Sequence, residues 1–297
     1  MSASFRIRVP ATTSNLGPGF DCFGLALGLH FEIEARPAPE LVLTSEGAPV
    51  PLDGSNLVVR TLVEHLPPGA PMPKLALHLK NRIPLARGLG SSASARVAGL
   101  ALAEVLQHGL AGVDPDRICE AACVLEGHPD NATPAVHGGF CLAAMGDGHE
   151  RVVLDGRQYL VIVPAFEIRT AEARAALPRQ VAFEDAVFNL QRAALAAVRV
   201  ARAGHLGAAL PFQDRLHQRH RIALDPRLEQ AFSALGALPM IEGAFLSGSG
   251  STIIALPRRG EEVTARSAAT RAFADLGLPV DAHLLAADNQ GLSIEAL

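Results

Sequence analysis

The order of strand-like and helical runs constrains the fold of this chain more than any other feature of its sequence. Runs rich in β-branched and aromatic residues, bounded by Gly, Pro and Asp, predict strands at residues 5–9, 25–35, 75–79, 140–145, 159–163, 252–256 and 282–286. Runs rich in Ala, Leu, Arg and Glu with helical apolar spacing predict helices at 92–107, 115–125, 184–203, 226–235 and 261–276. Because strands and helices are mixed without strict alternation, the pattern favours an α+β fold over a doubly wound parallel sheet. A boundary near residues 146–148 divides the 297 residues into an N-terminal domain, 1–147, and a C-terminal domain, 148–297.

The composition excludes several classes of protein. With 49% hydrophobic and 19% charged residues, the chain is too apolar for a disordered or coiled-coil protein. Its net charge of −4 and its 4% aromatic content, without Trp, argue against a nucleic-acid partner and favour a small molecule. Arg6 and Arg8 interrupt the first apolar stretch, and no later window reaches the length of a membrane span. We therefore expect a cytoplasmic protein with no membrane partner.

The four cysteines, Cys22, Cys119, Cys123 and Cys141, show neither C-x-x-C spacing nor a zinc-type pattern with histidine. We expect them to be small buried side chains in a reducing compartment rather than disulfide or metal ligands.

A loop with two glycines and three serines, GLGSSAS at residues 88–94, lies between the strand at 75–79 and the helix that starts near Ser92. Such a loop exposes backbone N–H groups and directs the positive end of a helix dipole at its contents, as a polyphosphate requires. A simple serine-capped helix start is the alternative. Neither Lys74 nor Lys80, the only lysines, is followed by Ser or Thr, so a Walker-type P-loop is excluded. A dinucleotide site is disfavoured because no second parallel strand with a terminal acid follows the helix.

Two further glycine-rich segments are ambiguous when taken alone. Residues 10–21, PATTSNLGPGFD, form a polar turn between two predicted strands, and residues 246–252, LSGSGST, separate two short apolar strands. Ordinary turns explain each of them about as well as a binding site does.

Polar residues on both sides of the middle of the chain suggest a metal site and an anion site. Glu120 lies about 200° around its helix from the apolar residue Ile118, so it faces either solvent or a site. The segment EGHPDN at residues 126–131 concentrates acid, imidazole and amide in an expected loop. Glu120 and Ser92 offer the oxygen ligands that Mg²⁺ takes when it carries ATP phosphates. Segments 170–174 and 213–221 carry arginines suited to bidentate capture of a carboxylate or phosphate.

In combination, four motifs resemble the homoserine kinase family of the GHMP small-molecule kinase superfamily. They are PATTSNLGPGFD at 10–21, P-x-x-x-GLGSSA at 84–93, EGHPDN at 126–131 with Pro134 and the glycine pair 138–139, and GAFLSGSG at 243–250. The resemblance implies a GHMP kinase fold of two domains with the active site between them and a ferredoxin-like C-terminal domain. It also implies transfer of the γ-phosphoryl group of ATP to the side-chain hydroxyl of L-homoserine, for threonine biosynthesis, and a possible homodimer.

The same resemblance implies roles for individual residues. Asn56 lies near the adenine, and Ser92 and Glu120 hold Mg²⁺. The triphosphate is cradled by Arg87, Gly88, Leu89, Gly90, Ser91, Ser92, Ala93 and Ser94. The amino-acid site is lined by Asn15, Asp21, His128, Asn131, Thr170, Arg174 and Arg221. Arg215 and Arg219 are alternative alignments to Arg221.

The implied site has a charge pattern that fits an amino-acid alcohol. Arginines suit the α-carboxylate and Asp21 suits the α-ammonium, while the amides of Asn15 and Asn131 suit the hydroxyl. Because an amide accepts no proton at neutral pH, we hypothesise that no side-chain base acts and that Glu120 contributes through the metal. Two alternatives remain: a kinase of another small alcohol, and a non-catalytic ligand sensor on the same scaffold.

Overall fold

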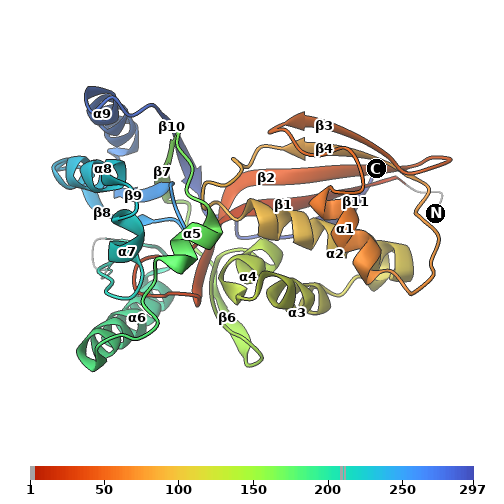
Figure 1. Ribbon diagram of the computed structural model, residues 1–297, viewed down its shortest axis with the longest axis horizontal. Helices are drawn as coiled ribbons and strands as arrows, with labels where there is room; N and C mark the ends of the chain where they lie inside the picture. The colour runs from red at the N-terminus through yellow and green to blue at the C-terminus, as the bar shows by residue number, and fades with distance from the viewer. Residues whose placement is uncertain (1–3, 208–209, 211) are drawn as a thin grey trace.

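Two β-sheets, each covered by helices, make up the chain (Figure 1). The computed structural model describes residues 4–207, 210 and 212–297. Among these residues, no helix combines the length and apolarity needed to cross a bilayer.

The first sheet contains seven strands. They are β1 (Phe5–Ser14), β2 (Phe23–Pro37), β3 (Val42–Gly47), β4 (Leu75–Asn81), β5 (Phe140–Ala144), β6 (Gly148–Val152) and β11 (Ser293–Ala296). Their order is β11-β1-β2-β4-β3, with β5 paired to β2 and β6 to β5. The long antiparallel pair β1–β2 aligns Phe5 with Ala35 and Ser14 with Gly24, so the turn between these strands lies at one end of the sheet.

Four helices pack on this sheet and on each other (Figure 1). They are α1 (Leu57–His65), α2 (Ser91–His108), α3 (Pro115–Glu126) and α4 (Pro129–His137). Residues Phe5, Ile7 and Val9 alternate into the core at the start of β1, whereas its second half is buried on both faces. In this half, Thr12 contacts Asn131 of α4 on one face and Thr13 contacts Ser247 on the opposite face, so both faces are covered.

The second sheet has the strand order of a ferredoxin-like fold. Its strands are β7 (Gln158–Pro164), β8 (Ile241–Leu246), β9 (Ile253–Pro257) and β10 (Val280–Ala286), in the antiparallel order β10-β7-β9-β8. Helices α5 (Thr170–Ala175), α6 (Phe183–Ala203), α7 (Gln218–Ile222) and α8 (Pro226–Gly236) follow β7, and α9 (Glu262–Asp275) joins β9 to β10. The sequence-based expectation of an α+β chain with a ferredoxin-like second part is confirmed.

Strand β7 joins the two hydrophobic cores. Tyr159, Val161 and Val163 belong to the large core under the first sheet, whereas Leu160 and Ile162 belong to the smaller core that α8 and α9 cover. Because successive side chains of a strand point to opposite faces, one strand serves both cores. The second sheet is therefore packed against the first part of the chain rather than tethered to it by a linker.

Local signals predicted the helices well where caps are strong. The side chains of Asp114 and Asp225 accept hydrogen bonds from backbone N–H groups at the starts of α3 and α8, each with Pro at the first helical position. The expectation of a loop at 126–131 is wrong in part, because Pro129 begins α4 and Pro134 lies inside this helix. Helices α1, α5 and α7 and strands β3, β6 and β11 were not predicted. The division at 147/148 stays a prediction; that position lies in the β5–β6 turn, and β11 returns to the first sheet.

We predict that Phe140→Ala lowers the free energy of unfolding by about 3–5 kcal/mol, because Phe140 is 1% exposed and stacks edge-on against Phe23. Phe183→Ala is the matched control, because Phe183 is 80% exposed, and should change stability by less than about 0.5 kcal/mol. Urea unfolding followed by circular dichroism measures both, and equal losses would show that Phe140 is not a core residue.

Candidate active site

A cavity between the two parts of the chain collects most of the residues that the sequence singled out. It is lined by the turn after β1, the loop before α2, the α3–α4 connection, α5, α7 and the β8–β9 turn. The predicted residues that line it are Asn15, Asp21, Arg87, Gly88, Leu89, Gly90, Ser91, Ser92, His128, Asn131, Thr170, Arg174 and Arg221. Asn56, Ala93, Ser94 and Glu120 do not line it. Residues that sequence analysis did not assign also line it: Ser14, Pro84, Ala86, Glu126, Asp130, Gly248 and Ser249.

The loop before α2 leaves the N-terminus of this helix open. Gly90, at φ 66°, precedes the helix and has no side chain to cap it. A Cβ atom on Gly90 would lie 1.9 Å from Thr12 Oγ1, so the close contact with β1 requires glycine. The first N–H groups of an α-helix have no partner within the helix, and the helix dipole adds a positive potential there. The start of α2 therefore offers the N–H groups and the positive potential that a phosphate site requires.

The third glycine-rich segment supports this loop. Ser247 Oγ donates to the carbonyl oxygen of Gly88 at 2.6 Å, and the Thr252 N–H donates to the carbonyl of Arg87 at 3.2 Å. The Gly248 N–H donates to the carbonyl of Ser14 at 3.2 Å. The β8–β9 turn thus holds the loop and the end of β1 together.

Of the predicted phosphate-loop residues, Ala93 and Ser94 do not line the cavity, whereas Arg87 lines it and holds the loop in place. Ser94 Oγ donates to the carbonyl oxygens of Pro10 and Gly90, and Ala93 is buried. The Arg87 guanidinium donates to the carbonyls of Pro164 and Ala165. Arg87 therefore ties the loop to the end of β7.

The carboxylate beside Ser92 is Glu126, not Glu120. Glu126 Oε1 accepts a hydrogen bond from Ser92 Oγ at 2.9 Å and lies 2.7 Å from Arg96 Nε. Glu120 is exposed and lines a separate cavity. The physical reason is helix geometry, because six residues move a side chain about 9 Å along the axis and about 240° around it. Glu126 is the last residue of α3, and Gly127, at φ 78°, ends the helix there. In the sequence, Gly127 is the signal that the helix ends at Glu126.

Asn56 lies outside the cavity and caps helix α1. Its Oδ1 accepts the Val58 N–H at 3.0 Å, which caps α1, and its Nδ2 donates to the Pro51 carbonyl at 2.6 Å. Its contact with an adenine stays a prediction.

Two arginines and one carboxylate face the other end of the cavity. Arg174 donates to both oxygens of Asp21, each at 3.1 Å. Arg221 is 3% exposed and donates to the Gly248 carbonyl at 2.8 Å, while its Nε has no hydrogen-bond partner. No ion pair of Arg221 occurs within the part of the chain that the structure describes, and burial lowers the pKa of this guanidinium. Arg221 is therefore a buried cation without a carboxylate at ion-pair distance among the residues that the structure describes.

The other two candidate arginines are elsewhere. Arg215 and Arg219 both pair with Asp185, at 3.1 and 2.8 Å, and their side chains are exposed. Of the three arginines, only Arg221 lines the cavity, and its role in binding a carboxylate stays a prediction.

The amide and imidazole side chains of the cavity are held by their neighbours. Thr12 Oγ1 donates to Asn131 Oδ1 at 2.8 Å, and Asn131 Nδ2 donates to Ser14 Oγ at 3.1 Å. His128 Nδ1 lies 2.5 Å from Asp130 Oδ1, and this hydrogen bond raises the pKa of His128. Asn15, at φ 71°, accepts the Asp21 N–H at 2.9 Å and so shapes the turn that carries Asp21.

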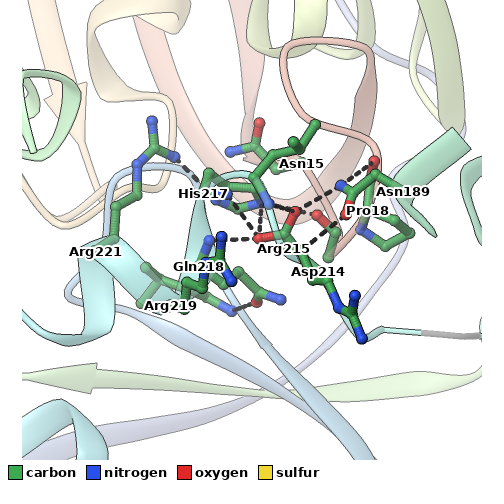
Figure 2. Close-up of polar contacts among 12 residues, drawn as sticks. Asn15, Pro18, Asn189, Asp214, Arg215, His217, Gln218, Arg219 and Arg221 are labelled. Atoms are coloured by element: carbon green, nitrogen blue, oxygen red, sulfur yellow. Dashed lines mark hydrogen bonds and ion pairs between the residues drawn. The ribbon is translucent and has the colours of Figure 1, made fainter. Parts of the chain in front are cut away.

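A buried polar network connects this turn to the segment that carries Arg221 (Figure 2). His217 is fully buried, and its Nε2 donates to the Gly17 carbonyl at 2.7 Å. Asp214 accepts the backbone N–H groups of the next residues and, at 2.7 Å, Asn189 Nδ2. Asn189 Nδ2 also lies 3.4 Å from the Pro18 carbonyl. The network fixes Arg221 relative to the turn.

We predict that His217 makes the fold less stable in acid. Burial lowers the pKa of His217 to about 4. Between about pH 6.5 and 4, this histidine is therefore protonated in the unfolded chain but neutral in the folded chain. Stability should therefore fall as the pH drops through this window, by up to about 1.4 kcal/mol per pH unit for this proton. Urea unfolding at pH 7 and pH 5 should show a smaller loss for His217→Gln than for the wild type. His108→Gln, at an exposed position on α2, should keep the wild-type slope; equal slopes in all three proteins would contradict the prediction.

Comparisons with known proteins identify the family of this chain. Residues 56–139 match the GHMP kinases N terminal domain, and residues 192–275 match the GHMP kinases C terminal domain. The chain is 44% identical to a homoserine kinase of Thermus thermophilus over 86% of this chain and 88% of that protein. It is 39% identical to a homoserine kinase of a Synechococcus species, over 98% and 97% of the two chains.

Solved structures give the same result for the fold. The crystal structure of homoserine kinase from Cytophaga hutchinsonii is similar with a TM-score of 0.84, at 25% identity over 99% of this chain and 98% of that one. A mevalonate kinase crystal structure shares the fold with a TM-score of 0.67, at 15% identity over 96% of this chain and 99% of that one. The chain therefore belongs to the homoserine kinase family of the GHMP kinases.

Proposed function

We propose that this chain transfers the γ-phosphoryl group of ATP to the side-chain hydroxyl of L-homoserine, giving O-phospho-L-homoserine. Its family makes the chain a small-molecule kinase that uses ATP. One observation carries the choice of an amino-acid alcohol: Asp21, Arg174 and the unpaired Arg221 line the same cavity as the loop before α2.

Both charges of a zwitterion find partners in this cavity. In the proposed complex the α-ammonium binds Asp21, and the α-carboxylate binds Arg174 and Arg221, replacing the direct Asp21–Arg174 contact. The substrate supplies the anion that Arg221 lacks, so its binding relieves a buried unpaired charge. An alcohol without an ammonium group, such as mevalonate, would leave Asp21 without that partner.

The residues at the start of α2 fit a magnesium ion. Ser92 Oγ and the Glu126 carboxylate offer two oxygen ligands at the helix N-terminus where phosphates bind, and Mg²⁺ takes one or two carboxylates together with phosphate oxygens and water. When bound, Mg²⁺ neutralises charge on the phosphates and helps to orient them.

The chain's own contribution is alignment and charge stabilisation. Backbone N–H groups at 88–92 face the phosphates, and the amides of Asn15 and Asn131 position the hydroxyl. Asn131 Oδ1 is occupied by Thr12, and an amide takes no proton at neutral pH, so we assign no side-chain base. A loose phosphoryl-transfer transition state places little demand on one. The intact Ser92–Glu126 pair argues against a non-catalytic sensor. A homodimer and a cytoplasmic location stay predictions.

The direct test is ATP consumption with and without L-homoserine, beside a panel that includes L-serine, L-threonine and mevalonate. We expect turnover to depend on L-homoserine and to fall sharply for alcohols that lack the ammonium group. Equal turnover with mevalonate would contradict the assignment.

We predict that Glu126→Gln lowers kcat by at least about 100-fold, equivalent to about 3 kcal/mol, because it removes the carboxylate beside Ser92. Glu120→Gln is the matched control on the same helix and should keep wild-type turnover. Steady-state kinetics at saturating Mg²⁺ measures both. The opposite pattern would restore Glu120 as the metal ligand.

We predict that Arg174→Ala raises the KM for L-homoserine by at least about 10-fold and changes the KM for ATP by less than about 2-fold, because it removes one carboxylate partner. Arg215→Ala removes an exposed arginine outside the cavity and should leave both constants unchanged. A larger effect on ATP would place Arg174 in the nucleotide site.

A further inference from the structure

Three side chains from separate elements meet where α3 and α4 face strand β6. Cys119 comes from α3, His137 is the last residue of α4, and His149 lies on β6. The Cys119 Sγ and one ring nitrogen of each histidine all lie within 4.8 Å of one another. The sequence shows no zinc-type spacing because three separate elements supply these groups.

This cluster is separate from the kinase site. Cys119 and His149 line a cavity of about 620 Å³ together with Asp116, Glu120 and Cys123. None of these residues lines the cavity that holds Ser92 and Arg221. The kinase reaction therefore does not account for this cluster.

His137 has an unused nitrogen. Its Nε2 is buried and has no hydrogen-bond partner, and it lies 3.7 Å from Asp116 Oδ1. Buried polar atoms without a partner are uncommon and costly. An imidazole nitrogen without a hydrogen-bond partner is free to act as a metal ligand.

We propose that Cys119, His137 and His149 bind a zinc-class divalent ion, with the Asp116 carboxylate as the fourth ligand. One sulfur and two imidazole nitrogens are the donor set of zinc, whereas Mg²⁺ takes oxygen ligands. The Cys119 thiol releases its proton to solvent as the bond to the metal forms. The stacked rings of His137 and His149, with centroids 4.2 Å apart, rotate apart to direct their nitrogens at the ion.

Binding at this site ties the β5–β6 hairpin to α3 and α4. An ion that binds the folded chain and not the unfolded chain stabilises the fold by mass action. Zinc should therefore raise the melting temperature, independently of the kinase reaction. The proposal does not depend on the identity of the kinase substrate.

The test uses the full chain after removal of metals with a chelator. Titration with Co²⁺ alone should saturate at one ion per chain and give the absorption spectrum of tetrahedral Co²⁺ with a thiolate-to-cobalt charge-transfer band. Zn²⁺ should displace Co²⁺ and abolish this spectrum. Cys119→Ser should lose the charge-transfer band. His149→Gln should weaken binding by at least about 100-fold. Cys141→Ser is the control, because this buried thiol donates to the Gly138 carbonyl and lies outside the cluster, and it should keep the spectrum.

Two further measurements keep the outcome clear. Circular dichroism establishes that each variant is folded, and Zn²⁺ should raise the melting temperature of the wild type but not of His149→Gln. The absence of a cobalt spectrum in the wild type, or a charge-transfer band that survives in Cys119→Ser, would overturn the proposal. Mg²⁺-dependent turnover of the metal-stripped protein is measured separately, so failure of the zinc site and failure of the kinase assignment are distinguishable.

Discussion

The open N-terminus of α2 is the constraint on which the rest of the site depends. A helix start normally takes a capping side chain, yet Gly90 has none, and its contact with Thr12 leaves no room for a Cβ atom. The unpaired N–H groups therefore remain available to an anion. Ser247 and Thr252 hydrogen-bond to the loop from the opposite side and so help to hold it in place.

The alternating faces of β7 explain how residues from distant parts of the chain reach this loop. Because the two cores share that strand, α5, α7 and the β8–β9 turn line the same cavity as the turn after β1. Arg221 and Arg174 then approach Asp21 without a flexible linker. The network around Asp214 and His217 adds a second connection (Figure 2). In it, His217 donates a hydrogen bond to the Gly17 carbonyl within the turn itself. An amino-acid substrate would thus meet partners whose positions both parts of the chain determine.

Sequence reasoning predicted the elements whose signals are local and failed where distant contacts decide. Asp114 and Asp225 cap their helices as their Asp-Pro pairs indicate. The helix α4 was missed because the polar residues at 126–131 indicated a loop, whereas packing against β1 and β2 maintains a helix that even contains Pro134. Glu120 was chosen for its polar helix face, but the direction of that face relative to α2 depends on how α3 packs. Glu126 becomes the neighbour of Ser92 only in the folded chain.

The packing of α3 and α4 also separates the two proposed metal sites. The C-terminal residue of α3, Glu126, lies with Ser92 beside the anion site, where oxygen ligands and phosphates favour a hard cation. Cys119 lies two turns earlier and faces the β5–β6 hairpin, where sulfur and nitrogen favour a softer one. Hard and soft donor sets that share a helix need not compete for the same ion. Zinc bound at the β5–β6 hairpin would then not displace magnesium from Ser92 and Glu126, so one chain could bind both ions at once.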